Sequence, residues 1–112
     1  MEKPIRVVLE EEARDFLLAL PMEIRKKFAI AFRKTEQGYQ GDWFEKMTGT
    51  DGLFEFRVTG KGKWHRILAF WDKNGPEKTL IVGTHGFDKK TNKTPAKEIK
   101  KAERTKQEYF AQ

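Results

Sequence analysis

Five basic side chains in the second half of the chain have the types that act on a phosphodiester: Arg57, Arg66, His85, Lys89 and Lys90. Cleaving RNA without a metal needs a base for the 2′-OH proton, an acid for the leaving 5′-oxygen, and fixed cations for the charge that builds on the phosphate. Arginine suits the last task because its planar fork meets two phosphate oxygens at once. The set therefore fits metal-independent phosphodiester cleavage.

His85 is the candidate for proton transfer, because the ordinary pKa of histidine lies near neutrality. It stands between Thr84 and Gly86 at the end of a strand-like run. A histidine at a strand end is also commonly a structural residue, and both interpretations stay open at this point. We expect His65 to be structural, since alternation along its strand puts it on the face opposite Arg66.

Three strand-like runs carry these side chains. Aromatic and β-branched residues fill 53–58, 64–71 and 79–84, and glycine-containing turns separate the three runs, which is typical of an antiparallel meander. Both faces of the middle run are largely apolar, so we expect it to be the central strand. Arg66 then lies over the interior of the sheet, where a cation costs free energy unless an anion meets it.

The first half of the chain predicts a short strand and a helix hairpin. A β-branched run at 5–9 precedes apolar residues at helical spacing in 13–20 and again in 24–32, with Pro21 as the first residue of the second helix. The stretch 42–52 looks like a loop. Three of its side chains are expected to anchor it to the core rather than to stack on bases: Trp43, Phe44 and Met47.

The end of the chain predicts a third helix. Thr94 is the expected cap, Pro95 occupies the first turn, and the helix runs to about Tyr109. Its apolar stripe is thin, with Ile99 and Ala102 among many Lys and Glu residues, so we expect it to dock weakly. Together the elements predict an α+β fold (β-α-α-β-β-β-α), with a helix hairpin packed on a mainly antiparallel sheet.

Composition narrows the class of protein. A chain of 112 residues suits one domain, 1–112, and the absence of cysteine excludes disulfides and thiolate zinc sites. With two histidines and no apolar stretch of membrane-spanning length, we expect no metal, no cofactor, no membrane contact and a cytoplasmic location. Residues 1–55 carry 9 basic against 11 acidic residues, and residues 56–112 carry 14 against 6. A basic half favours a polyanionic partner, although a lysine-rich surface kept for solubility is the alternative.

Three segments carry a resemblance to a known family: 48–57 (TGTDGLFEFR), 63–68 (KWHRIL) and 85–95 (HGFDKKTNKTP). With the lysine-rich helix that follows, they resemble the RelE superfamily of bacterial toxins, in its HigB-like, phage-derived branch. The resemblance covers nearly the whole chain. It implies a RelE-like fold, a ribosome-dependent endoribonuclease that cuts mRNA, and a cognate antitoxin as partner, and we expect a monomer when the toxin is free.

The resemblance also implies roles for single residues. Arg57 and Arg66 match the sheet cations that grip the scissile phosphate, and His85 and Lys90 match the basic segment that supplies proton transfer and further charge. Further RNA contacts are expected from Lys61, Lys63, Lys89 and Lys93. Family members that use a tyrosine place it near the C-terminal end of the site. Only Tyr109 offers one there, so the general acid stays open.

Two other functions stay open beside the endoribonuclease. One is a relative within the same superfamily that inhibits DNA gyrase and cuts nothing, but such relatives tend to lack the cation and histidine set. The other is a basic nucleic-acid-binding module without catalysis, for which the charge asymmetry would suffice.

Overall fold

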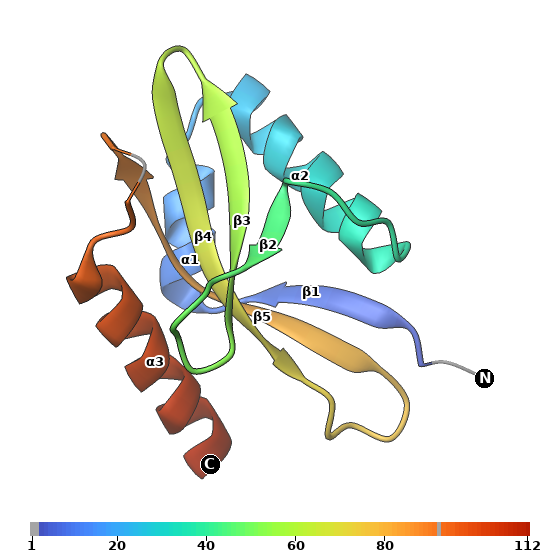
Figure 1. Cartoon of the computed structure of the whole chain (residues 1–112). Helices are drawn as coiled ribbons and strands as arrows, with labels where there is room; N and C mark the ends of the chain where they lie inside the picture. Colours follow the sequence, from blue (N-terminus) through green and yellow to red (C-terminus); the bar gives the residue numbers. More distant parts are fainter. Residues whose placement is uncertain (1–2, 92) are drawn as a thin grey trace.

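The computed structural model describes residues 3–91 and 93–112. The elements follow in the order β1 (Ile5–Leu9), α1 (Glu11–Leu18), α2 (Met22–Glu36), β2 (Phe44–Lys46), β3 (Leu53–Gly60), β4 (Lys63–Asp72), β5 (Thr79–Lys89) and α3 (Ala96–Ala111) (Figure 1). No helix in the described ranges is long and apolar enough to cross a membrane.

One five-stranded sheet organises the molecule, with strand order β1-β5-β4-β3-β2. The pairs β2–β3, β3–β4 and β4–β5 are antiparallel, and β1 lies parallel to β5 at the other edge. The predicted meander and the central position of its middle strand are therefore confirmed. The α+β fold class is confirmed as well, with one strand more than the sequence indicated.

The helices cover the two faces of this sheet. In Figure 1 α1 passes behind β4, and α2 and α3 lie on opposite sides of the strands. Because side chains alternate along a strand, Ile67 of β4 joins Phe28 of α2 in one buried cluster, whereas Leu68 joins Ala102 of α3 in the other. The central strand thus contributes apolar side chains to two cores, which explains why both of its faces read as apolar.

The stretch 42–52 is not wholly a loop, which corrects the prediction. Residues Phe44–Lys46 form the short edge strand β2 on β3, because Phe44 stacks on Phe54 at 5.0 Å between ring centroids and packs on Phe56 at 4.3 Å. The anchoring roles are confirmed: Trp43 and Phe44 pack against the core under α2, and Met47 packs against the core under α3.

β5 runs five residues beyond the predicted end at residue 84, through Gly86 to Lys89. Gly86 faces α1, where a Cβ would collide with the ring of Phe16. The missing side chain therefore lets α1 close on the strand. A register shift between Leu68 and Ala69 of β4 marks the opposite stretch of the ladder.

Both prolines that were predicted to start helices lie one position outside them. Pro21 and Pro95 are the residues before α2 and α3, with ψ angles of 149° and 140° that no helix interior adopts. The prediction that Thr94 caps α3 is wrong, since its hydroxyl donates instead to the carboxylate of Glu55 at 3.0 Å. α3 ends at Ala111, two residues beyond the expected end.

Candidate functional site

Cations from three strands meet on the sheet face that carries α3. Arg57 of β3 and Arg66 of β4 are direct partners in the antiparallel register. Lys89 of β5 is the register partner of Trp64, which lies two residues before Arg66 in β4 and shares its face. Strand alternation places Glu55 on the same face as Arg57, two residues earlier in β3. Three like charges on one face need a counter-charge, and the position of Glu55 supplies it.

The carboxylate of Glu55 is the centre of this cluster. Its Oε1 lies 2.8 Å from Nε of Arg66, 3.5 Å from Nζ of Lys89 and 3.6 Å from Nε of Arg57. Its Oε2 accepts a hydrogen bond from Thr94. The short contact to Arg66 lacks hydrogen-bond alignment and is an ion pair. Glu55 thus supplies, from within the protein, the anion that the buried Arg66 needs.

The three cations differ sharply in access. The side chains of Arg66 and Lys89 are each 5% exposed, whereas that of Arg57 is 38% exposed. Burial lowers the pKa of both Arg66 and Lys89, and the charge of Glu55 opposes that shift. Arg57 is therefore the member of the cluster that a ligand in solvent reaches most easily.

A cavity of about 400 Å³ opens beside Arg57. We call it the cation cavity; its lining is Glu45, Lys46, Met47, Thr48, Glu55, Arg57, Lys89, Lys93, Thr94 and Ile99. Glu45 accepts a hydrogen bond from Arg57 at 3.0 Å and is half exposed, so it differs from the buried Glu55. Four cations against two carboxylates leave the lining positive.

His85 lies away from this cavity, buried beneath α3. Its Nε2 lies 3.1 Å from Oε1 of Glu98 and its Nδ1 lies 3.0 Å from the hydroxyl of Thr84. Burial lowers the pKa of His85, and Glu98 opposes that shift. In the register His85 faces Leu68, and it does not line the cation cavity. The structure therefore does not bring the predicted proton-transfer residue into contact with Arg57.

The other predicted residues divide into two groups. Lys89 and Lys93 line the cation cavity, whereas Lys90 is exposed just beyond β5. Lys61 and Lys63 lie at the far turn between β3 and β4, where Lys61 pairs with Glu23 at 2.8 Å. The structure thus separates this turn from the lysines around the cavity.

Tyr109 and His65 make local contacts of their own. The hydroxyl of Tyr109 donates to Asp72 at 2.7 Å, which raises the pKa of Tyr109 to about 12. Tyr109 does not line the cation cavity, so its geometry gives no support to a role as general acid there. Nδ1 of His65 lies 2.6 Å from Asp88, which agrees with the expected structural role without testing it.

Sequence reasoning missed five polar lining residues: Glu45, Lys46, Thr48, Glu55 and Thr94. The signal for Glu55 was present, because a residue two positions before Arg57 in a strand shares its face. Glu45 and Lys46 could be found only after β2 was placed on β3. Thr94 was assigned to the helix cap instead.

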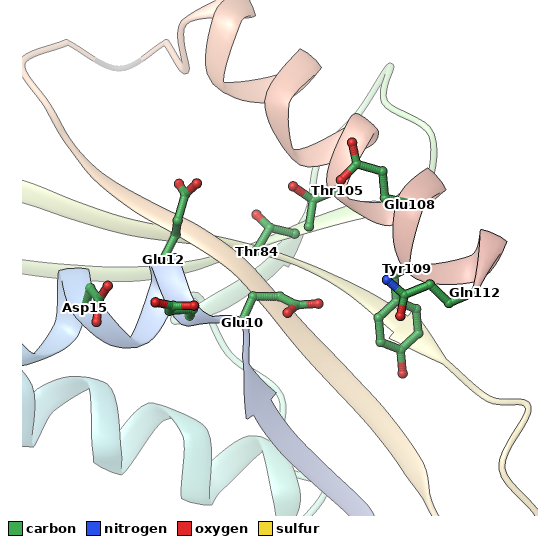
Figure 2. Close-up of a pocket in the computed structure, with 9 residues that line it drawn as sticks. Glu10, Glu12, Asp15, Thr84, Thr105, Glu108, Tyr109 and Gln112 are labelled. Carbon is green, nitrogen blue, oxygen red and sulfur yellow. The ribbon is translucent and has the colours of Figure 1, made fainter.

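A second cavity, of about 530 Å³, opens between the start of α1 and the second half of α3. We call it the acidic cleft; it is lined by Glu10, Glu11, Glu12, Asp15, Thr84, Thr105, Glu108, Tyr109 and Gln112. Figure 2 shows carboxylates on both of its sides, Glu12 from α1 and Glu108 from α3.

Within residues 3–91 and 93–112, no three His, Cys, Asp or Glu side chains form a group that could hold a metal ion.

A comparison with protein families identifies the chain. Residues 15–107 match the model of a family described as phage derived protein Gp49-like (DUF891). No curated protein matches the chain. The matched segment includes all of α2, the whole meander and most of α3, and therefore the complete cation cavity. The chain belongs to the phage-derived Gp49-like family, a member of the RelE/HigB-like toxin superfamily.

Proposed function

We propose that this protein is the toxin of a type II toxin-antitoxin system and acts as a ribosome-dependent endoribonuclease on mRNA. The observation that carries the proposal is the cation cavity, in which Arg57 faces solvent beside three lysines. A positive hollow of this kind suits the phosphate of a single RNA strand. Membership of the Gp49-like family supports the same assignment.

The cations of the cavity have different proposed roles toward the phosphate. Arg57 binds the scissile phosphate through its fork, and Lys46, Lys89 and Lys93 add positive charge around it. Arg66 supports this arrangement through its ion pair with Glu55, the same carboxylate that lies 3.6 Å from Arg57. A cluster held in place before the substrate arrives needs little reorganisation during the reaction.

Three further residues have proposed roles in or beside proton transfer. Glu45 has the exposed carboxylate of the cavity, and it takes the 2′-OH proton while Arg57 stays beside it. His85, with Lys90 as further charge, is the proposed donor to the leaving 5′-oxygen. Since Glu98 and α3 cover His85, this role requires that the start of α3 moves on the ribosome.

The chemistry needs no metal at the toxin. The substrate's own 2′-OH attacks the phosphorus, the bond to the 5′-oxygen breaks, and that oxygen leaves with a proton. The products are a 2′,3′-cyclic phosphate upstream and a 5′-OH downstream. RNA with 2′-O-methyl at the cut position therefore binds but resists cleavage.

The partner in this proposal is a cognate antitoxin. An acidic segment that folds on binding would neutralise the cation cavity, and the antitoxin would inhibit directly. At saturating antitoxin, cleavage should fall to the background level. Cleavage that continues undiminished would contradict direct inhibition.

Induced expression tests the proposed function. Wild type should stop growth and fragment mRNA, whereas Arg57→Ala and Arg66→Ala should not, and Lys26→Ala on the outer face of α2 should behave as wild type. End-group analysis of the fragments should give 5′-OH ends. Growth arrest with intact mRNA and altered DNA supercoiling would instead favour gyrase inhibition. RNA binding without cleavage would favour the non-catalytic module.

A further inference from the structure

A third hollow, of about 680 Å³, continues from the cation cavity. It lies between the start of β3, the end of β4 and the last turns of α3. We call it the basic aromatic groove; its lining is Lys46, Gly52, Phe54, Trp71, Lys73, Asn74, Lys106 and Phe110. This lining contains three lysines, three aromatic rings and no carboxylate, in contrast to the acidic cleft.

Lys46 joins the two positive hollows. Within the described ranges, it is the one residue that the linings of the cation cavity and the basic aromatic groove share. Lys46 ends the edge strand β2, so the two hollows are contiguous at this residue. A strand whose phosphate lies at Arg57 can therefore extend past Lys46 into the groove.

The rings of the groove are fixed by packing. Phe54 stacks on Phe44, and its centroid lies 6.0 Å from that of Trp71 in an edge arrangement. Phe110 packs on Phe70 at 5.5 Å but stays 41% exposed. Rings held from behind lose little freedom when a flat ligand stacks on them.

The lysines lie beside these rings. Nζ of Lys73 lies 5.4 Å from the centroid of Trp71, within the range of a cation–π contact. Nζ of Lys106 donates to the backbone oxygen of Asp51 at 2.7 Å, which holds it at the rim. Positive charge and aromatic surface thus line one groove, the combination that binds single-stranded nucleic acid without reading its sequence.

We propose that the basic aromatic groove binds the single-stranded RNA that flanks the phosphate in the cation cavity. Bases stack on Trp71 and Phe110, and phosphates contact Lys46, Lys73 and Lys106. The proposal rests on the proposed function for the identity of the strand. An acidic protein segment would meet the lysines but would gain little from exposed ring faces, so RNA suits the whole lining better.

The test compares two uncleavable probes on the full chain. Fluorescence anisotropy measures the affinity for 2′-O-methyl single strands of about three and about ten nucleotides, the longer one within the usual site size for such grooves. Wild type should bind the longer probe at least about tenfold more tightly, since stacking of one base alone is worth about that factor. The ratio of the two affinities, the gain with length, therefore measures the contribution of the groove to binding.

Two pairs of variants locate that gain. Lys73→Ala should remove most of it and reduce the slope of log affinity against log salt by about 0.7, the value for one lost contact to a single strand. Lys26→Ala removes the same charge from the outer face of α2 and should change neither. Phe110→Ala should lose several-fold in affinity for the longer probe, and Phe110→Tyr should restore it. An unchanged gain in both Lys73→Ala and Phe110→Ala overturns the proposal.

Two further arms separate the possible failures. Arg57→Ala should weaken both probes by the same factor and leave their ratio intact. If ribosomal mRNA stays uncut but the ratio still depends on Lys73 and Phe110, the groove proposal stands while the endoribonuclease proposal fails. A polyglutamate peptide serves as the acidic alternative. If Lys73→Ala weakens binding of this peptide but leaves binding of the RNA probe unchanged, the groove binds an acidic protein segment and the RNA proposal is overturned.

Discussion

The two hollows that flank the second half of α3 are lined by opposite charges. Toward the start of α1, the helix borders the acidic cleft with Thr105, Glu108 and Tyr109, whereas Lys106 and Phe110 border the basic aromatic groove. Residues one position apart on a helix point in different directions, so one helix serves both hollows. The net charge of +6 hides this division.

The difference teaches how a small protein orients a polyanion. A phosphate chain that approaches the molecule is attracted to one side of α3 and repelled by the other, within the roughly 10 Å over which charges act at 0.1 M salt. In the proposed function, the acidic cleft would help to orient the RNA without contacting it. Four changes test this contrast, in order of decreasing expected effect.

The largest effect should come from the buried centre of the positive side. Glu55→Gln leaves the charges of Arg66 and Lys89 buried without their shared anion, and we expect a loss of about 3–5 kcal/mol in the free energy of unfolding. Glu45→Gln, which breaks a largely exposed pair, should cost less than about 1 kcal/mol. Urea denaturation measures both. Equal stability of the two variants would show that Glu55 is not the anchor of the cluster.

The next effect concerns activity. Arg57→Ala should lower ribosomal cleavage at least about a hundredfold, the usual scale for a lost charge-stabilising group, while the far-UV spectrum stays that of wild type. Glu11→Gln, in the acidic cleft, should cut as wild type does. Arg66→Ala and His85→Ala should each match the loss in Arg57→Ala. A folded Arg66→Ala protein that stays toxic would remove Arg66 from the site.

A third effect is the pH dependence of stability. The pKa of His85 is lowered on folding, so the unfolded chain takes up the proton first as pH falls. Stability should therefore fall as pH drops from about 6.5 toward the lower folded pKa, by at most about 1.4 kcal/mol per pH unit. Glu98, Glu12 and Lys101 face His85 and set the extent of that window.

Urea midpoints at a series of pH values measure this dependence. The variant His85→Gln should lose the part of the slope just below pH 6.5 and keep the decline at more acidic pH, where carboxylates such as Asp72 and Glu12 take up protons. An identical slope in wild type and variant would mean that His85 does not titrate in this range.

The smallest effect should come from the acidic cleft. Glu108→Lys inverts one charge at the end of α3, and binding of a single-stranded RNA at low salt should tighten by about twofold, because only screened repulsion is removed. The gain should vanish near 1 M salt. A gain that persists at high salt would indicate a direct contact and would contradict the role of repulsion.

Local pattern was enough to predict most of the fold. The meander, its central strand and the anchors Trp43, Phe44 and Met47 follow from alternation and turn residues, which act over short stretches of chain. The edge strand β2 was missed because three residues carry too little periodicity to reveal a strand that exists only through its partner β3.

The site was predicted less completely, because its contacts join distant parts of the chain. Alternation does place Arg57 opposite Arg66 once the hairpin is drawn. It does not show that Glu55 forms the ion pair with Arg66. Nor does it show that Thr94 donates its hydroxyl to Glu55 instead of capping α3. The burial of His85 depends on where α3 docks, and nothing in the strand that carries His85 encodes that position.

The bond between Thr94 and Glu55 has a thermodynamic consequence. It links Thr94, two residues before α3, to the carboxylate that holds the cations, so the position of the helix and the arrangement of the cluster are coupled. Linkage is reciprocal: a ligand that binds more tightly when α3 is docked must itself strengthen the docking of α3. A ligand of that kind and any partner that lifts α3 would then weaken each other's binding by the same factor, even where they touch no common atom.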